Sequence, residues 1–330
     1  MKIPAVFEKL NKGTTLKVGV ILLNDFSMMA FSNSTEPLRA LNRILQKDIF
    51  EPSYLGFNAT NKIASNGINV NVQNIFEVNE DYDIYMFIGG YYNNDTSINE
   101  KVISWIRDKH YKGKTFIAVS GASYLLAKTK ILDGKKCTIH WEYLDIFKEE
   151  NPDIITTDNI YEVDGNIITV SGGSAAFDLM LLIAEQYFGQ EIATDVADQF
   201  IHQKRRSSDE LQHSTYIEKY GIHNEKMIQI LHYMENHIED PISINDIANL
   251  INISSRQINR LFTKYLNEKP YTYYLNMRLK KAQSYLQSTS MPISQISIAC
   301  GFSSFSHFSK AYKNLFTHSP KMERELKNAS

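Results

Sequence analysis

The chain has 330 residues, of which 43% are apolar and 22% charged, and its formal net charge at pH 7 is −2. This balanced composition excludes fibrous and intrinsically disordered proteins, and the length exceeds what one hydrophobic core usually spans, so we expect at least two domains. With two cysteines and no apolar run of signal-peptide or membrane-span length, the sequence excludes a disulfide scaffold and predicts a cytoplasmic protein.

Strand and helix patterns alternate between residues 16 and 190. Short apolar runs typical of buried strands occur at 16–23, at 83–90, at 114–120 and after Gly165. Helical patterns follow them at 34–45, at 101–110, at 123–132 and up to Gly189. This alternation predicts an α/β domain, a flavodoxin-like parallel sheet sandwiched between helices.

Five turns of this domain are expected to gather at the carboxyl edge of the sheet, where open parallel sheets bind ligands. They are "LLNDFSMM", "IGGYYNN", "AVSGAS", "TIHWE" and "TVSGGSAA". The third lies in "FIAVSGASYLLA" (116–127), whose strand, tight turn and helix have the outline of a nucleophile elbow. Ser120 lies in this turn, but a nucleophilic serine also needs an adjacent base.

Residues 203–222 are polar, lack a strong period and are predicted to be a linker. The parts on either side differ in charge. Residues 1–222 contain 22 Lys and Arg against 29 Asp and Glu, whereas residues 223–330 contain 13 against 8. A basic C-terminal third predicts binding to an anionic polymer. The two domains are therefore expected at 1–202 and 223–330.

The C-terminal third contains an internal repeat. The stretch "PISINDIANLINISSRQINRLFTKYLNEKP" (241–270) matches "PISQISIACGFSSFSHFSKAYKNLFTHSP" (292–320) at an offset of 49 to 50 residues. Each copy predicts a helix-turn-helix, and residues 271–287 predict one connecting helix. Ser254 and Ser303 are expected to cap the second helix of each copy, and Gly301 is expected to supply a positive φ in the second turn.

The outward positions of both second helices are polar or basic. Arg and Lys can hydrogen-bond guanine, and Asn and Gln can hydrogen-bond adenine, in a major groove wide enough for one helix. Two helices on a rigid connecting helix suit successive major-groove faces about 34 Å apart. The outward residues are Arg256, Gln257, Asn259, Arg260 and Lys264 in the first copy, and Ser304, Ser306, His307, Lys310 and Lys313 in the second.

This segment resembles the DNA-binding domain of AraC-type transcription regulators. The resemblance is carried by "ISSRQINRLF" and "IACGFSSFSHFSKAYKNLF" and covers about 100 residues. It implies two recognition helices in adjacent major grooves. Base contacts would come from Arg256, Asn259 and Arg260, with Lys264 on the same face, and from Ser306, His307 and Lys310.

The α/β part resembles the class I glutamine amidotransferase-like fold of the PfpI type. The residues that carry this resemblance are "FIGG" (87–90), "VSGASYLLAKTKILDGKKCTIHW" (119–141) and "ITVSGGSAAFDLMLLI" (168–183). The segment "FSMMAFSNSTEPLRALNRI" (26–44) is similar to the start of regulators that join this domain to an AraC-type tail.

In the amidotransferase-like pattern the nucleophile is a cysteine two residues before a glycine. Gly121 is taken as that glycine and sets the register, so the nucleophile position falls on Val119, which has no nucleophilic chemistry. The alternative register makes Ser120 the nucleophile, with His140 as the base by resemblance and Glu142 as the acid that orients it. We expect a site without catalysis, metal or cofactor.

The resemblance implies a small effector at this edge, because relatives of this architecture respond to amino acids and quaternary amines. Backbone N–H groups after Ser120 can bind a carboxylate, and acidic and aromatic groups suit an ammonium head. Glu36 is also placed to pair with Arg39, and Trp141 to lie in the core. The expected effector-binding residues are Phe26, Glu36, Tyr91, Val119, Ser120, His140, Trp141 and Glu142, with Asp25 and Tyr92 in the same turns.

These features predict a sequence-specific transcription regulator, by family an activator, that binds double-stranded DNA as a homodimer formed through the α/β domain. Effector binding would change the arrangement of the C-terminal DNA-binding domains and favour promoter contact and recruitment of RNA polymerase. Two alternatives remain open. One is an amidase or hydrolase that uses Ser120 and carries an accessory DNA-binding tail. The other is a constitutive DNA-binding protein whose body only dimerises.

Overall fold

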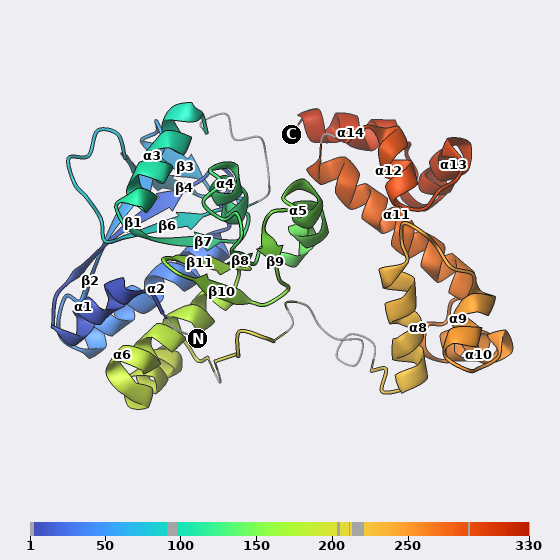
Figure 1. Ribbon diagram of the computed structural model, residues 1–330, viewed down its shortest axis with the longest axis horizontal. Coiled ribbons are helices and arrows are strands. Elements are labelled where there is room, and N and C mark those ends of the chain that lie inside the picture. Colours follow the sequence, from blue (N-terminus) through green and yellow to red (C-terminus); the bar gives the residue numbers. More distant parts are fainter. Residues whose placement is uncertain are drawn as a thin grey trace. The chain divides into compact units, whose positions relative to one another are not determined.

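The computed structural model describes residues 3–90, 98–202, 205–210, 212, 221–289 and 291–329. The chain divides into two units, Met1–Gln212 and His213–Ser330 (Figure 1). The first unit therefore includes the N-terminal half of the segment 203–222 that we expected to be a linker. No helix among the described residues combines the length and the apolar character needed to cross a membrane.

A seven-stranded sheet forms the centre of the first unit, in the order β10-β11-β7-β6-β1-β2-β5. Neighbouring strands run parallel except β10, which pairs antiparallel with β11. The strands are β1 (Leu16–Leu22), β2 (Phe50–Gly56), β5 (Gln73–Asn74), β6 (Ile84–Ile88), β7 (Thr115–Val119), β10 (Tyr161–Asp164) and β11 (Ile167–Val170). Outside this sheet lie an antiparallel hairpin, β3 (Asn61–Ile63) with β4 (Asn69–Asn71), and a short parallel pair, β8 (Lys136–Cys137) with β9 (Ile155–Thr156). The predicted sheet is confirmed.

Helices cover both faces of the sheet, because successive side chains of each strand enter two different cores. Met86 of β6 lies in the core on the side of α1, α2 and α6, and Phe87 lies in the core on the side of α3, α4 and α5. The helices are η1 (Ala5–Phe7), α1 (Glu8–Asn11), α2 (Met28–Ile44), α3 (Glu100–Tyr111), α4 (Ala122–Lys128), η2 (Trp141–Tyr143), α5 (Leu144–Glu150) and α6 (Ala175–Gln199).

Several elements differ from the expected bounds. The helix expected over 34–45 begins at Met28, because the Ser27 side chain accepts a hydrogen bond from the Ala30 N–H and caps the first turn. Gly189 breaks α6 with φ 87° and ψ 167°, and helical residues continue to Gln199 instead of ending at the glycine. β2 was not expected, since its partly exposed, proline-containing sequence lacks an apolar run.

The second unit is helical throughout the part that the structure describes, as predicted. Its helices are α8 (Glu225–Asn236), α9 (Ile244–Leu250), α10 (Ser255–Leu266), α11 (Pro270–Ser288), α12 (Ile293–Ala299), α13 (Phe305–Phe316) and α14 (Pro320–Ala329). Ser254 caps α10 in a reciprocal capping box with Gln257, as expected. Gly301 has φ 73°, and a Cβ there would lie 2.5 Å from the Ile238 carbonyl oxygen. The cap of α13 is Ser304, one residue later than the expected Ser303.

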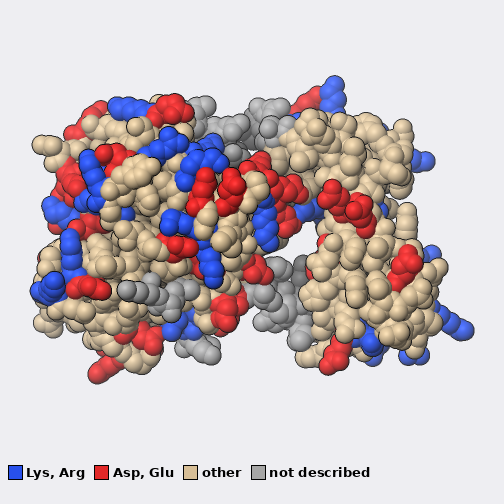
Figure 2. Space-filling view, in the orientation of Figure 1, with Lys and Arg blue, Asp and Glu red and all other residues tan. Residues whose placement is uncertain are grey.

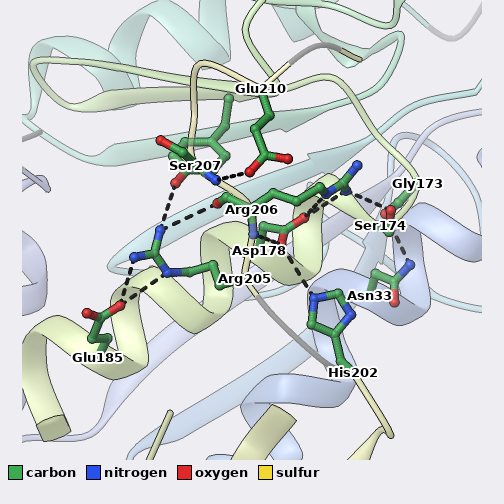
Figure 3. Close-up of polar contacts among 11 residues, drawn as sticks. Asn33, Gly173, Ser174, Asp178, Glu185, His202, Arg205, Arg206, Ser207 and Glu210 are labelled. Carbon is green, nitrogen blue, oxygen red and sulfur yellow. Dashed lines mark hydrogen bonds and ion pairs between the residues drawn. The ribbon is translucent and has the colours of Figure 1, made fainter. Parts of the chain in front are cut away.

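The last described residues of the first unit, 205–210 and 212, are here called the strap. The strap is bound to α6 mainly by Arg206, whose Nε and Nη2 donate to the Asp178 carboxylate at 2.9 and 2.7 Å. The Arg206 backbone N–H donates to the same carboxylate at 2.7 Å, and Nη2 also donates to the Ser174 hydroxyl at 2.7 Å (Figure 3). Asp178 is 0% exposed. A buried carboxylate is thus neutralised by a residue that enters from the strap.

The neighbouring Arg205 makes a different contact. Its guanidinium pairs with Glu185 at 2.9 Å, and both side chains are about one third exposed to solvent. At the other end of the strap, the Gln212 side chain donates to the Thr138 hydroxyl and to the carbonyls of Ile139 and Asn159 at 3.0 to 3.1 Å. The strap therefore joins α6 to the turn that precedes η2.

Arg206→Ala should destabilise the first unit by about 3–5 kcal/mol, because it removes the guanidinium from the buried Asp178 carboxylate and leaves only the more distant His202 Nε2, at 3.5 Å, to offset the charge. Arg205→Ala is the matched control and should cost about 1 kcal/mol or less, because its pair is partly solvated. Urea unfolding followed by tryptophan fluorescence measures both, since the two tryptophans, Trp105 and Trp141, lie in the first unit. Equal losses in the two variants would contradict a special role for Asp178.

Candidate effector pocket and nucleic-acid interface

The five turns that we expected at the carboxyl edge of the sheet do lie side by side. Backbone hydrogen bonds link four of them in order: Ser27 to Gly89, Gly89 to Val119, and Ser120 to Val170, at 2.9 to 3.1 Å. The fifth turn is held by the Thr138 N–H, which donates to the Thr169 hydroxyl, and by the Thr138 carbonyl, which accepts from the Ser123 hydroxyl.

The strained residue of the elbow is Ser120, not Val119. Ser120 has φ 60° directly after β7, the left-handed conformation that side chains rarely adopt and that is frequent at functional sites. Val119 is the last residue of β7 and is buried in the core on the α2 and α6 side. The register that we derived from Gly121 was therefore wrong by one residue.

Gly121 serves close packing instead of a strained turn. Its φ is −66°, and a Cβ on it would lie 2.3 Å from the Gly90 carbonyl oxygen. A Cβ on Gly172 would lie 2.8 Å from the Cβ of Ser120. The glycines of three turns thus allow the backbone to close tightly around the Ser120 side chain, which is 6% exposed.

The elbow lacks the contact that would activate a serine. Among the described residues, no hydrogen bond joins the Ser120 hydroxyl to His140 or to any other base. His140 Nδ1 instead lies 3.5 Å from the Glu142 carboxylate. Burial lowers the pKa of His140 below its ordinary value, and the negative charge of Glu142 opposes that shift. A neutral imidazole near neutral pH does not repel a cation.

His140, Trp141 and Glu142 lie in the fifth turn, where His140 is half-buried and Trp141 and Glu142 are exposed. His140 caps η2, and its ring lies 5.7 Å from the ring of Trp141 and 6.0 Å from that of Tyr143. Trp141 is 46% exposed, so it does not lie in the core. An aromatic surface beside a carboxylate can attract an alkylammonium group.

Other predicted effector residues lie elsewhere. Phe26 is 0% exposed, bridges Ala64 and Gly90, and belongs to the core. Glu36 lies two turns inside α2 and forms an ion pair with Arg39 at 2.6 Å, which was the alternative we considered for it. Tyr91 and Tyr92 lie outside the described residues.

Sequence reasoning missed the polar residues that hold the edge together. Asn33 of α2 donates to the Gly173 carbonyl at 3.1 Å, next to the Ser174 hydroxyl that binds Arg206. Asp178 was the detectable signal, because a charged residue inside the apolar run "AAFDLMLLI" must be paired if it is buried. The partner cannot be identified from the sequence, because 28 residues separate Asp178 from Arg206.

The second unit presents its predicted DNA-contacting residues to solvent. Ile258 and Phe262 turn one face of α10 into the core, and Phe308 and Tyr312 do the same for α13. The opposite faces carry the exposed residues Arg256, Asn259, Arg260, Lys264, Ser306, His307 and Lys310. In the face shown in Figure 2, Lys and Arg side chains project from the margin of this unit where Figure 1 draws α10 and α13.

The basic side chains on these helices are available for an external anion. Among the described residues, no carboxylate pairs with Arg256, Arg260 or Lys310. The Asn259 amide is already engaged within α10, since it donates to the Ser255 carbonyl at 2.8 Å, and it would have to exchange this bond for one to DNA. The Lys264 ammonium lies 4.8 Å from the ring centre of Tyr265 near the end of α10. The two faces therefore combine unpaired cations with polar groups that can exchange their partners.

Comparisons with known proteins agree with both parts. The profile of the DJ-1/PfpI family matches residues 17–186, and that of a helix-turn-helix domain matches residues 247–325. The chain is 34% identical to the HTH-type transcriptional regulator CdhR of Pseudomonas aeruginosa, over 93% of this chain and 90% of the relative. It is 30% identical to the regulator GbdR of the same species, over 93% and 84%. It is 28% identical to the regulator GlxA of Rhizobium meliloti, over 92% and 94%.

Solved structures support the fold of the first unit. An AraC family transcriptional regulator from Pseudomonas putida matches 56% of this chain and 99% of its own, with a TM-score of 0.51 at 20% identity. A transcriptional regulator protein from Vibrio parahaemolyticus matches 57% of this chain and all of its own, with a TM-score of 0.50 at 24% identity.

We expect no Ser120-dependent hydrolysis, because no base among the described residues is hydrogen-bonded to Ser120, and a serine without such a base is a weak nucleophile. Rates of amide and ester hydrolysis should be the same for the wild type and for Ser120→Ala. A chromogenic panel of short amides and esters measures this. Turnover by the wild type that disappears in Ser120→Ala would show that the elbow is catalytic.

Proposed function

This chain belongs to the AraC-type transcription regulators whose first domain is of the DJ-1/PfpI family, and we propose that it activates transcription in response to a small effector with an ammonium group. The single observation that carries this proposal is an elbow that keeps its strained turn at Ser120 but, among the residues that the structure describes, has no base hydrogen-bonded to that serine. The pocket is then a binding site, and the second unit supplies the output through DNA.

The effector that we propose is an amino acid or a betaine-like quaternary amine. Its cation would lie against Trp141 and Glu142, beside a neutral His140. Its carboxylate would lie toward Ser120 and the N–H groups that open the first turn of α4, which have no intrahelical partner.

We propose that the strap couples this pocket to the DNA-binding unit. It holds two of the turns around Ser120: Arg206 binds Ser174 in one, and Gln212 binds Thr138 in the other. The same chain continues into the second unit. An effector that moves either turn would shift the equilibrium between a bound and a released strap, by its differential affinity for the two states.

We propose that the regulator works as a homodimer, each protomer contacting one half-site, and recruits RNA polymerase in the cytoplasm. Support for a self-contact on the first unit comes from exposed apolar side chains around the start of α2 and the β3–β4 hairpin. They are Met29, Tyr54, Ile63 and Ile68. Two protomers would present four recognition helices to a palindromic operator.

The effector proposal predicts binding of amino acids or quaternary amines in a calorimetric titration of the full-length protein. Trp141→Leu should weaken the binding of an ammonium-bearing effector about 2- to 30-fold, because the loss of a cation–π contact costs about 0.5–2 kcal/mol. Tyr111→Leu is the control, an aromatic residue that is 84% exposed in the same unit. The proposal would be overturned if no amine or amino acid gave a heat of binding while a compound of another chemical class did. Operator binding that does not depend on an effector would favour the constitutive alternative.

Arg260→Ala should relax the base preference at one operator position and cost about 1–3 kcal/mol of binding free energy. Lys264→Ala, four residues along α10, should weaken binding to all sequences alike and reduce the salt slope by about 1, because we assign it to phosphate. Affinities for an operator and its single-base variants at several salt concentrations measure both. If Arg260→Ala weakened all DNA equally, its role in base recognition would be wrong.

A further inference from the structure

The first residue of α13 is an exposed aromatic, Phe305. Its side chain is 52% exposed, although Phe308 and Tyr312 on the same helix are buried. The Phe305 ring lies 6.1 Å from the ring of Phe308, which packs on Phe302 at 5.1 Å. One side of the ring therefore rests on the core, and the other faces solvent at the first turn of α13, where Ser306 is also exposed.

The internal repeat shows what distinguishes this position. The caps Ser254 and Ser304 are equivalent, so Phe305 of α13 corresponds to Ser255 of α10. By the same offset, Ser306 and Ser309 stand where α10 has Arg256 and Asn259. The second helix thus has serines in place of Arg256 and Asn259 and a large apolar residue in place of Ser255, which lies at the end of the helix that reaches base edges in helix-turn-helix complexes.

We propose that Phe305 recognises a thymine through its 5-methyl group. Hydrogen-bonding groups line the major groove, and the thymine methyl is the apolar group among them, with phenylalanine among the side chains that contact it. A ring already seated on Phe308 loses little conformational freedom when it meets a base. Burial of the exposed ring face against the methyl removes apolar surface from water, which Ser255 cannot do.

This assignment rests on the proposed function, because it requires α13 to lie in a major groove. The experiment uses the full-length protein. An operator is first selected from a random duplex pool, and each thymine is then replaced singly by deoxyuridine, which pairs identically but lacks the methyl. Fluorescence anisotropy gives the affinity of each duplex for the wild type, Phe305→Ala and Phe305→Leu.

We expect one thymine in each half-site at which loss of the methyl lowers the affinity of the wild type about fourfold. This factor corresponds to the free energy of burying one methyl group. Phe305→Ala should bind the thymine and uracil duplexes equally, and Phe305→Leu should retain part of the preference. Met322→Ala, which truncates an apolar residue that is 50% exposed on α14, should keep the full preference. Circular dichroism melting establishes that each variant is folded.

The outcomes separate this inference from the function on which it depends. If the wild type enriches a sequence but no uracil substitution weakens it, or if the preference survives in Phe305→Ala, the assignment of Phe305 is overturned while DNA binding stands. The exposed Phe305 ring would then be assigned to a contact with another protein instead of DNA. If the wild type enriches no sequence, the proposed DNA recognition and this inference both fail.

Discussion

The pairing of the buried Asp178 carboxylate with Arg206 connects the parts of the first unit that matter for function. Asp178 lies in the first turn of α6, directly after the glycine turn beside Ser120, and Arg206 lies in the strap that leads to the second unit. A charge that is 0% exposed is costly without its counter-ion, so release of the strap from α6 has an energetic cost that the effector's preference for the released state would have to offset. The same pair that stabilises the fold therefore holds the strap against α6, as the coupling that we propose between the effector site and the DNA-binding unit requires.

The carboxyl edge of the sheet keeps the backbone geometry of a catalytic site without its chemistry. Ser120 is held with φ 60° between glycine turns, and a non-glycine residue in that conformation is strained by about 1–2 kcal/mol. His140, the base expected by resemblance, lies beside Glu142 and has its pKa lowered by burial. What remains is an edge of closely packed turns that carries aromatic and acidic groups, and we propose that it binds a ligand reversibly.

The second unit contains the helix-turn-helix motif twice, and the outward surfaces of the two recognition helices differ. Both copies have a serine cap and two buried residues one turn apart on the recognition helix. The outward residues have diverged, with Arg256 and Asn259 in one copy against serines and Phe305 in the other. Core positions are constrained by packing, whereas outward positions are constrained by what the helix meets, so the two copies suit different base sequences.

The sequence by itself determined the fold class, the two helix-turn-helix copies and the outward faces of α10 and α13, because periodicity and capping are local properties of the chain. It placed the five turns at one edge, since parallel strands share a carboxyl end. Only the tertiary structure decided that Ser120 and not Val119 is the elbow residue, because the register depends on the backbone φ of one position. It also decided that Arg206 neutralises Asp178 and that Glu36 pairs with Arg39, because the sequence offers a charged side chain many possible partners and only the packing brings particular ones within reach.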